Sequence, residues 1–226
     1  MTTAIHTIHM GLDNIYVLKG KGTVIIDGGD PKKEKVFLKG LEDVSVRPEE
    51  VQLIILTHGH WDHIGSAKEI KDITGAKIAM HRREANWLEQ SLKPLPSGVT
   101  PWGKVFIGIH KLFMPLISIP PVKVDVVLDD NVLSLTDYGI PGRILHTPGH
   151  SAGSVSVLLD TGEAFVGDLA MNRFPLRLSP GLPIFADDLD VVSSCLHSLF
   201  AHGARTIYPA HGKPFRAEAI QNTLSR

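Results

Sequence analysis

Histidine and aspartate side chains follow four short apolar runs of this chain, and that placement restricts how the chain can fold. The run Val51 to Leu56 is apolar and β-branched, which favours a buried strand. Three later runs have the same form. The four runs are residues 51–56, 143–145, 164–167 and 206–208, and they lead to His58, His150, Asp168 and His211. Strands that end in this way build a site where their ends converge, so the sequence predicts a sheet protein with a site at one edge.

The segment 57–63 has the sequence Thr-His-Gly-His-Trp-Asp-His. His58 and His60 are two residues apart, which places both imidazoles on one side of an extended backbone. Gly59 between them allows a tight bend. Asp62 and His63 begin a predicted helix that runs to about residue 74, and a carboxylate is favoured at a helix start. One turn between a strand and a helix can therefore direct two pairs of side chains to neighbouring points.

The side chains at these positions form a metal-ligand set. Imidazole and carboxylate together suit zinc, iron or manganese, whereas calcium requires oxygen ligands. The His150 and His211 positions adjoin Gly149 and Gly212, where the backbone can approach closely. The predicted ligands are His58, His60, Asp62, His63, His150, Asp168 and His211.

With these motifs in this order, the chain resembles the metallo-β-lactamase fold superfamily of metallohydrolases from about residue 27 to residue 211. The resemblance implies that His58, His60 and His150 hold one metal. It implies that Asp62, His63 and His211 hold a second, with Asp168 bridging the two. Asp27 would be a carboxylate behind the ligands that braces their turn. Two divalent ions are implied, with zinc expected and iron or manganese as alternatives.

Composition limits the remaining classes of protein. A length of 226 residues suits one large α/β domain over residues 1–226. The net charge of −1 without a basic run argues against a nucleic-acid partner. The single cysteine, Cys195, is expected to pack in a helix. Residues 1–12 lack the features of a signal peptide, and no apolar stretch could span a membrane, so we expect a cytoplasmic protein without a membrane partner.

The pattern of apolar residues predicts a four-layer αββα sandwich, in which two mixed sheets are flanked by helices. This agrees with the fold of the superfamily that the chain resembles. Predicted strands lie near residues 4–9, 14–19, 22–27, 51–57, 77–80, 124–128, 142–146, 154–160, 164–167 and 206–209. Predicted helices lie near residues 31–43, 62–74, 82–91, 186–202 and 215–224.

An apolar, proline-rich insert at about 91–123 interrupts this alternation. Its apolar residues from Val105 to Leu116 follow helical spacing, so a short amphipathic helix is expected. Such a segment must be covered by the core, by a second subunit in a homodimer, or by a ligand. If it covers a ligand, Phe106 and Phe113 are candidate substrate contacts. Asn172 and Arg173 are further candidates, because they follow Asp168 directly.

The expected chemistry is hydrolysis by a hydroxide that two metals share, with Asp62 and Asp168 as the carboxylates placed to accept a proton. The expected substrate is a small carboxylic ester, thioester or lactone, with an apolar acyl part if the insert lines the pocket. A mononuclear iron sulfur dioxygenase of the persulfide type is the first alternative. A phosphodiesterase or nuclease on the same fold is the second.

The sequence departs from several known branches of the superfamily, and these differences narrow the resemblance to the glyoxalase II-like and lactonase-like members. The presence of Asp168 argues against true β-lactamases with an Asp-His pair in the first motif, which lack the bridging aspartate. The histidine at position 60 argues against flavodiiron proteins, which have glutamate there. The chain ends about 15 residues after His211, without the carboxy-terminal helical part of glyoxalase II. No tyrosine soon after Asp168 matches the one that acyl-homoserine lactonases use, and Tyr208 could replace it only by a different geometry.

Overall fold

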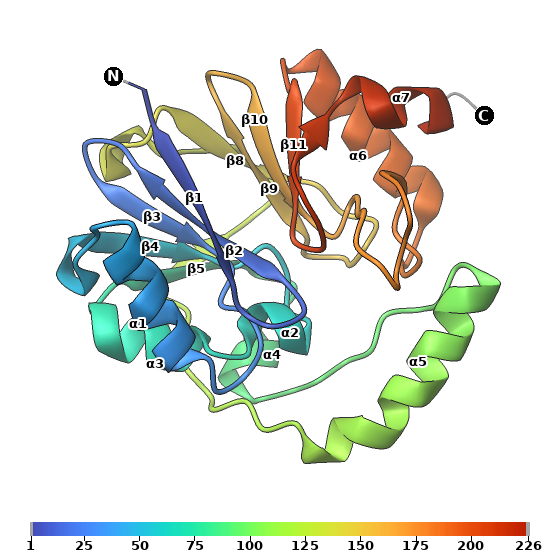
Figure 1. Ribbon diagram of the computed structural model, residues 1–226, viewed down its shortest axis with the longest axis horizontal. Helices are drawn as coiled ribbons and strands as arrows, with labels where there is room; N and C mark the ends of the chain where they lie inside the picture. The colour runs from blue at the N-terminus through green and yellow to red at the C-terminus, as the bar shows by residue number, and fades with distance from the viewer. Residues whose placement is uncertain (1, 225–226) are drawn as a thin grey trace.

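The computed structural model describes residues 2–224 and contains two six-stranded sheets packed face to face (Figure 1). In the first sheet the strands follow chain order. They are β1 (Ala4–His9), β2 (Asn14–Lys19), β3 (Thr23–Ile26), β4 (Val51–Ile55), β5 (Lys77–His81) and β6 (Val126–Leu128). The first three pair antiparallel, and the strands from β3 to β6 pair parallel. This sheet is therefore mixed, as predicted.

The second sheet has the order β12-β11-β10-β9-β8-β7. Its strands are β7 (Leu133–Ser134), β8 (Gly142–His146), β9 (Val155–Leu159), β10 (Glu163–Gly167), β11 (Thr206–Pro209) and β12 (Phe215–Arg216). The β10–β11 pair is parallel, whereas the other pairs are antiparallel. The sequence did not predict the two-residue strands β7 and β12.

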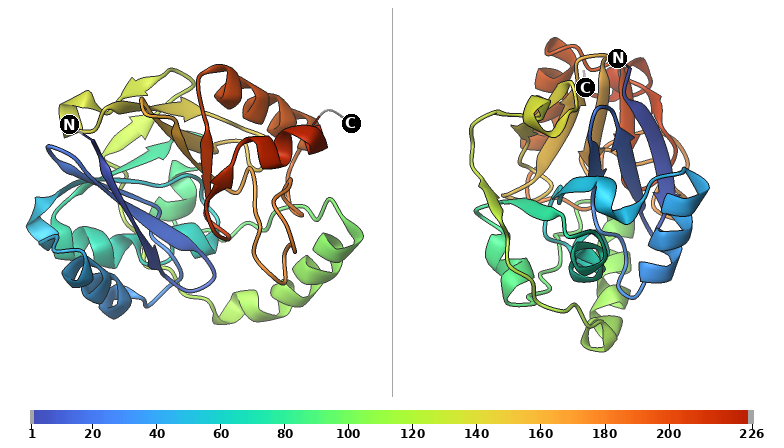
Figure 2. Two further views of the ribbon diagram at one scale, coloured as in Figure 1. Left: turned by 45° about the horizontal axis from the view of Figure 1, so that its top comes forward. Right: turned by 90° about the vertical axis from the view of Figure 1, so that its left-hand side faces the viewer.

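Helices cover the outer face of each sheet (Figures 1 and 2). On the first sheet lie α1 (Glu34–Asp43) and α3 (Ala67–Thr74), and on the second lie α6 (Leu189–Ala201) and α7 (Glu218–Leu224). Side chains of β3 show the layering, because Ile25 packs toward the helices while Val24 and Ile26 pack between the sheets. This alternation on a strand buried on both faces gives the predicted four layers.

The predicted helix 62–74 is two helices, α2 (Trp61–Ile64) and α3. The break occurs at Ser66, whose hydroxyl accepts from the backbone N–H of Lys33 at 3.0 Å and donates to the carbonyl of Asp30 at 2.6 Å. A side chain that binds neighbouring backbone competes with helix formation, so the turn replaces a continuous helix.

Four other helices begin later than predicted, among them α6, which begins at Leu189 instead of residue 186. The helix predicted at 82–91 is α4 (Ala85–Glu89), and α1 begins at Glu34 instead of residue 31. The region predicted as helix 215–224 begins as β12, where Phe215 pairs with Ile207, and α7 follows it. These starts are delayed because the preceding residues pair with other segments.

The insert 91–123 contains one long helix, α5 (Pro101–Phe113), followed by a short 3-10 turn (Met114–Leu116). Thr100 accepts from the backbone N–H of Gly103 at 2.9 Å and Pro101 occupies the first turn, which together fix its start. Extended connections hold α5 away from the sheets (Figure 1). Among residues 2–224, no helix is long and apolar enough to cross a membrane.

Candidate metal centre

The structure brings the seven predicted ligands together where β4, β8, β10 and β11 end. His58, His60 and His150 offer ring nitrogens to one point, and Asp62, His63 and His211 offer ligand atoms to a second point. The Asp168 carboxylate lies between these groups. Its Oδ1 is 3.5 Å from His63 Nε2, and its Oδ2 is 3.4 Å from His211 Nε2 and 3.7 Å from His150 Nε2. Asp168 therefore stands where the resemblance implied a bridging carboxylate.

Within residues 2–224, three buried atoms at this centre have no hydrogen-bond partner. They are His58 Nε2, His63 Nε2 and Asp168 Oδ1. An unpartnered buried polar atom costs about 1–3 kcal/mol, so native proteins rarely contain three in one place without a ligand. Divalent ions bound by imidazole and carboxylate would satisfy all three atoms, and this chemistry fits the predicted ligand set.

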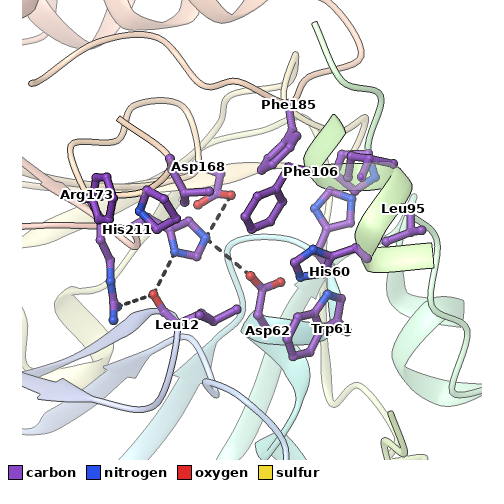
Figure 3. A pocket seen from close by; sticks show the side chains of 16 residues that line it. Leu12, His60, Trp61, Asp62, Leu95, Phe106, Asp168, Arg173, Phe185 and His211 are labelled. Carbon is purple, nitrogen blue, oxygen red and sulfur yellow. Dashed lines mark hydrogen bonds and ion pairs between the residues drawn. The ribbon is translucent and has the colours of Figure 1, made fainter. Parts of the chain in front are cut away.

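Hydrogen bonds on the outer side of the rings fix which nitrogen faces the centre. His150 donates from Nδ1 to the carbonyl of Phe185 at 2.9 Å. His211 donates from Nδ1 to the carbonyl of Leu12 at 3.0 Å, as Figure 3 shows. His60 differs, since its Nδ1 faces His150 Nε2 at 3.0 Å. Outer bonds of this kind hold a ligating imidazole in one tautomer and orientation.

Charges at the centre favour a cation. Burial alone would lower the pKa of His63, but the carboxylates of Asp27 and Asp168 raise that pKa to about 10. Burial would raise the pKa of Asp62, but hydrogen bonding to His211 and the charge of His63 lower it to about 2. The carboxylates are thus ionised, and the negative potential that attracts a proton to His63 would equally attract a metal ion.

His60 has the opposite surroundings. Burial and the nearby ring of His150 lower the pKa of His60 to about 3. Burial and the charge of His63 also hold the pKa of His58 well below its usual range. Neutral imidazole is the form that coordinates a metal, so this half of the centre is ready to bind without losing protons.

Asp27 lies behind the ligands, as the resemblance implied. It accepts from the backbone N–H and the hydroxyl of Thr57, both at 2.8 Å, and from His63 Nδ1 at 3.1 Å. It thereby joins the residue that precedes His58 to the ring of His63. Asp27 also has a positive φ of 66°, an uncommon backbone conformation for a residue other than glycine.

Substitution of Asp27 should weaken metal binding without abolishing it. We expect Asp27→Ala to lower metal affinity by about 10–100-fold, because His63 loses the acceptor that orients its ring. Competition with a chromogenic chelator would measure the change. Asp43→Ala on α1 is the control, since Asp43 pairs only with Lys39 at the surface. Equal metal affinities of the parent and the Asp27→Ala protein would show that Asp27 stabilises only the turn and does not contribute to metal binding.

Glu84 is a residue of the centre that the sequence did not reveal. It is fully buried, and its two carboxylate oxygens accept from the backbone N–H groups of Gly59 and Gly153, each at 2.6 Å. Gly59 separates His58 from His60, and Gly153 belongs to the loop that carries His150. One carboxylate therefore joins the two loops that supply the first ligand group. Its only sequence signal is its place just after the β5 strand end.

Loss of the Glu84 charge should affect that ligand group. In Glu84→Gln the amide presents an N–H₂ to one of the two backbone donors, so one bond is lost while the volume is kept. We expect metal affinity at the His58 group to fall by about tenfold. Glu89→Gln is a matched control, because Glu89 accepts from a single backbone N–H, that of Val124 at 3.1 Å. The role assigned to Glu84 fails if both variants bind metal alike.

An apolar cavity that is partly open to solvent lies beside the centre (Figure 3). Its floor includes His60, Asp62, Asp168 and His211. Its walls come from several parts of the chain: Leu12, Trp61 of α2, Leu95 and Pro96, Phe106, Ile107 and His110 of α5, and the segment 173–176 with Phe185. A mostly apolar cavity with a few convergent polar groups is the usual form of a small-molecule site.

The four predicted substrate contacts divide into two groups. Phe106 and Arg173 line the cavity. Asn172 is instead bonded to Lys213, accepting from its N–H at 2.8 Å and donating to its carbonyl at 2.9 Å, so it braces the loop after His211. Phe113 lies about two helical turns further along α5, does not line the cavity and is 55% exposed. Asn172 and Phe113 therefore lie outside the cavity lining, and substrate contact by these residues stays a prediction.

Tyr208 and Cys195, two other residues considered in the sequence analysis, pack against the core. Tyr208 packs against the rings of Tyr16 and Phe165 and does not line the cavity, so it is not positioned as an electrophile there. Cys195 is half-buried against the core formed by α6 and the second sheet, in the packing role expected from the sequence.

Comparison with known proteins identifies the family. Residues 11–211 match the Metallo-beta-lactamase superfamily, so the chain belongs to it and is a metal-dependent hydrolase of that class. The chain is 22% identical over 243 residues to the probable metallo-hydrolase YflN of Bacillus subtilis (strain 168), covering 98% of this chain and 88% of that protein. It is 27% identical over 203 residues to the beta-lactamase-like protein 2 homolog of Drosophila melanogaster, covering 88% of this chain and 58% of that protein.

A solved structure supports the fold. The archaeal metallo-beta-lactamase superfamily protein ST1585 from Sulfolobus tokodaii superposes with a TM-score of 0.70 at 21% identity, covering 100% of this chain and 86% of that chain. At this identity the likeness establishes the fold alone.

Proposed function

We propose that this enzyme hydrolyses a carboxylic ester, thioester or lactone that has an apolar acyl part. The observation that supports the proposal is the apolar cavity that opens onto Asp62, Asp168 and His211. We place the enzyme with the glyoxalase II-like and lactonase-like members of the superfamily. Two zinc ions are the proposed metals, one held by the His58 group and the other by the His63 group, with Asp168 shared.

When bound, such ions would lower the pKa of water toward 7 and polarise the substrate carbonyl. The chain's own residues would supply the rest of the chemistry. Asp62 and Asp168 are the carboxylates on the cavity floor, so they can accept a proton and pass it to the leaving group. Phe106, Trp61 and Phe185 would hold the acyl part and exclude water from the reacting bond.

The two halves of the proposal can be tested with a series of acetyl, butyryl and hexanoyl esters of one alcohol. If the acyl part lies against Phe106, two added methylenes should raise kcat/KM by roughly tenfold. Phe106→Ser should flatten this dependence. Phe113→Ser is the matched control, since this phenylalanine lies at the end of the same helix, exposed and outside the cavity. A flat profile in the parent protein would contradict an acyl site in the cavity.

Elemental analysis of protein purified without added metal separates the proposed reaction from the alternatives. Two metal ions per chain together with ester hydrolysis support the proposal. One iron per chain with oxygen uptake on a persulfide substrate would replace it with the dioxygenase. Hydrolysis of phosphodiesters but not carboxylic esters would replace it with the phosphodiesterase.

A further inference from the structure

The outer face of α5 and the turn after it form an exposed apolar stripe. Its members recur at the spacing of one helix face and are 49–79% exposed: Val105, Ile109, Leu112, Phe113 and Leu116. The inner face of the same helix, with Phe106 and Ile107, lines the cavity. The helix is therefore apolar on two faces, and packing within the chain accounts for only one of them.

A second exposed apolar segment lies at the same cavity. Phe174 is 74% exposed while also lining the cavity, and Leu178 is 90% exposed. Trp102 of α5 donates from its indole N–H to the carbonyl of Pro175 at 2.9 Å, which ties this segment to the helix. Figures 1 and 2 show α5 at the margin of the molecule, away from the sheets. The exposed apolar side chains thus gather around the cavity that we propose binds an apolar acyl part.

The charges of these segments differ from those of the rest of the chain. Residues 91–123 and 169–186 contain six of the 23 lysines and arginines and none of the 24 aspartates and glutamates. The remainder of the chain is consequently acidic. On α5, Lys104 and Lys111 are seven residues apart on one flank of the apolar stripe, and neither forms an ion pair within residues 2–224. An apolar face bordered by lysines is the pattern of a helix that lies on an anionic membrane.

We propose that the outer face of α5, together with the segment 174–178, docks on the surface of an anionic lipid bilayer. The substrate then enters the cavity from the bilayer. This inference rests on the proposed function, because it assigns a source to the apolar acyl substrate. The sequence led us to expect no membrane partner because it contains no spanning segment, but a helix that lies on the surface requires none.

Charge favours lipid over a second copy of the chain as the occupant. A twofold contact through α5 would place the same basic segment against itself, and neither that segment nor residues 169–186 offers a carboxylate to pair with Lys104 or Lys111. Anionic headgroups would pair with both lysines while the acyl region receives the stripe.

Sedimentation of the whole protein with vesicles tests the proposal. We expect the parent to bind vesicles of phosphatidylcholine mixed with phosphatidylglycerol, to bind phosphatidylcholine alone more weakly, and to lose binding as salt rises. The double variant Leu112→Glu and Leu116→Glu should reduce the partition coefficient by about tenfold or more. Lys104→Gln should reduce it by about fivefold on the anionic vesicles only.

The matched control is the double variant Val36→Glu and Leu38→Glu on α1. These side chains are 40% and 41% exposed and lie on a helix that does not border the cavity, so vesicle binding should be unchanged. Turnover of a water-soluble acetyl ester should be the same in the parent and in the Leu112→Glu and Leu116→Glu variant. That comparison shows that the variant is folded.

The outcomes separate the surface from the function. Ester turnover without vesicle binding would overturn the membrane proposal and leave the proposed function intact. Vesicle binding without ester turnover would retain the surface and overturn the function. A third outcome is a parent protein that does not bind vesicles and forms a dimer in light scattering. If Leu112→Glu dissociates that dimer, the stripe is a contact with a second copy of the chain.

Discussion

Replacement of Asp168 by alanine should lower kcat by about three orders of magnitude or more, which corresponds to several kcal/mol of lost transition-state stabilisation. The physical reason is the position of this carboxylate between the two ligand groups. It lies 3.4–3.7 Å from ring nitrogens of His63, His150 and His211, and nearby charges hold its pKa well below its usual range despite burial. Steady-state kinetics on the ester with the highest parent turnover would measure the loss.

The Asp168→Ala result can be read only with two further measurements. Metal content shows whether one ion remains, and circular dichroism shows whether the chain is folded. Asp160→Ala is the control, because Asp160 is an exposed hairpin residue paired with Arg143. A folded Asp168→Ala protein with near-normal turnover would remove Asp168 from the reaction.

The metal centre could be predicted because its signals are local. His58 and His60 follow one strand, and Asp168 follows another, so the exit of each strand sets the direction of the side chain. The convergence of the strands follows from the sheet. Asp27 was identified by resemblance. It follows β3, and its bonds reach Thr57 after the neighbouring strand β4 and His63 in α2.

Glu84 could not be predicted for the opposite reason. Its two acceptors meet backbone N–H groups at Gly59 and Gly153, 25 and 69 residues away in the chain, and backbone donors leave no pattern in the sequence. The residue also stands just before a helix, where an exposed glutamate is common. Only the packing of one sheet on the other brings the two glycines to the same carboxylate.

The position along α5 explains why Phe106 and Phe113 differ: they lie on a similar side of the helix, but Phe113 is about two turns beyond the part that lines the cavity. Apolar residues run from Val105 to Leu116, and the sequence alone does not distinguish a face toward the cavity from a face toward the outside. The hydrogen bond from Trp102 to Pro175 and the packing of Phe106 on Phe185 select the inner face. Both partners belong to the irregular segment after Asp168, whose course has no local signal.

The second large effect concerns metal content. We expect His58→Ala to lose mainly the ion held with His60 and His150, and His211→Ala to lose mainly the ion held with Asp62 and His63. Each variant should therefore retain about one of two ions, because the unaltered group keeps all three of its own ligands while the altered group keeps two. Elemental analysis after dialysis against metal-free buffer measures this directly.

The two variants should also differ in what remains. His58→Ala leaves the anionic half of the centre, where carboxylates raise the pKa of His63 to about 10, so binding of its remaining ion should weaken as pH falls and protons compete. His211→Ala leaves the half with His60. Burial and the nearby ring of His150 lower the pKa of His60 to about 3, so the remaining ion of this variant should tolerate acid better.

His197→Ala on the exposed face of α6 is the control, since its ring bonds to the carbonyl of Ser193. Unchanged metal content in both His58→Ala and His211→Ala would show that these side chains do not hold the metals. Equal acid sensitivity of the two remaining ions would show instead that the charges around the two halves do not separate them.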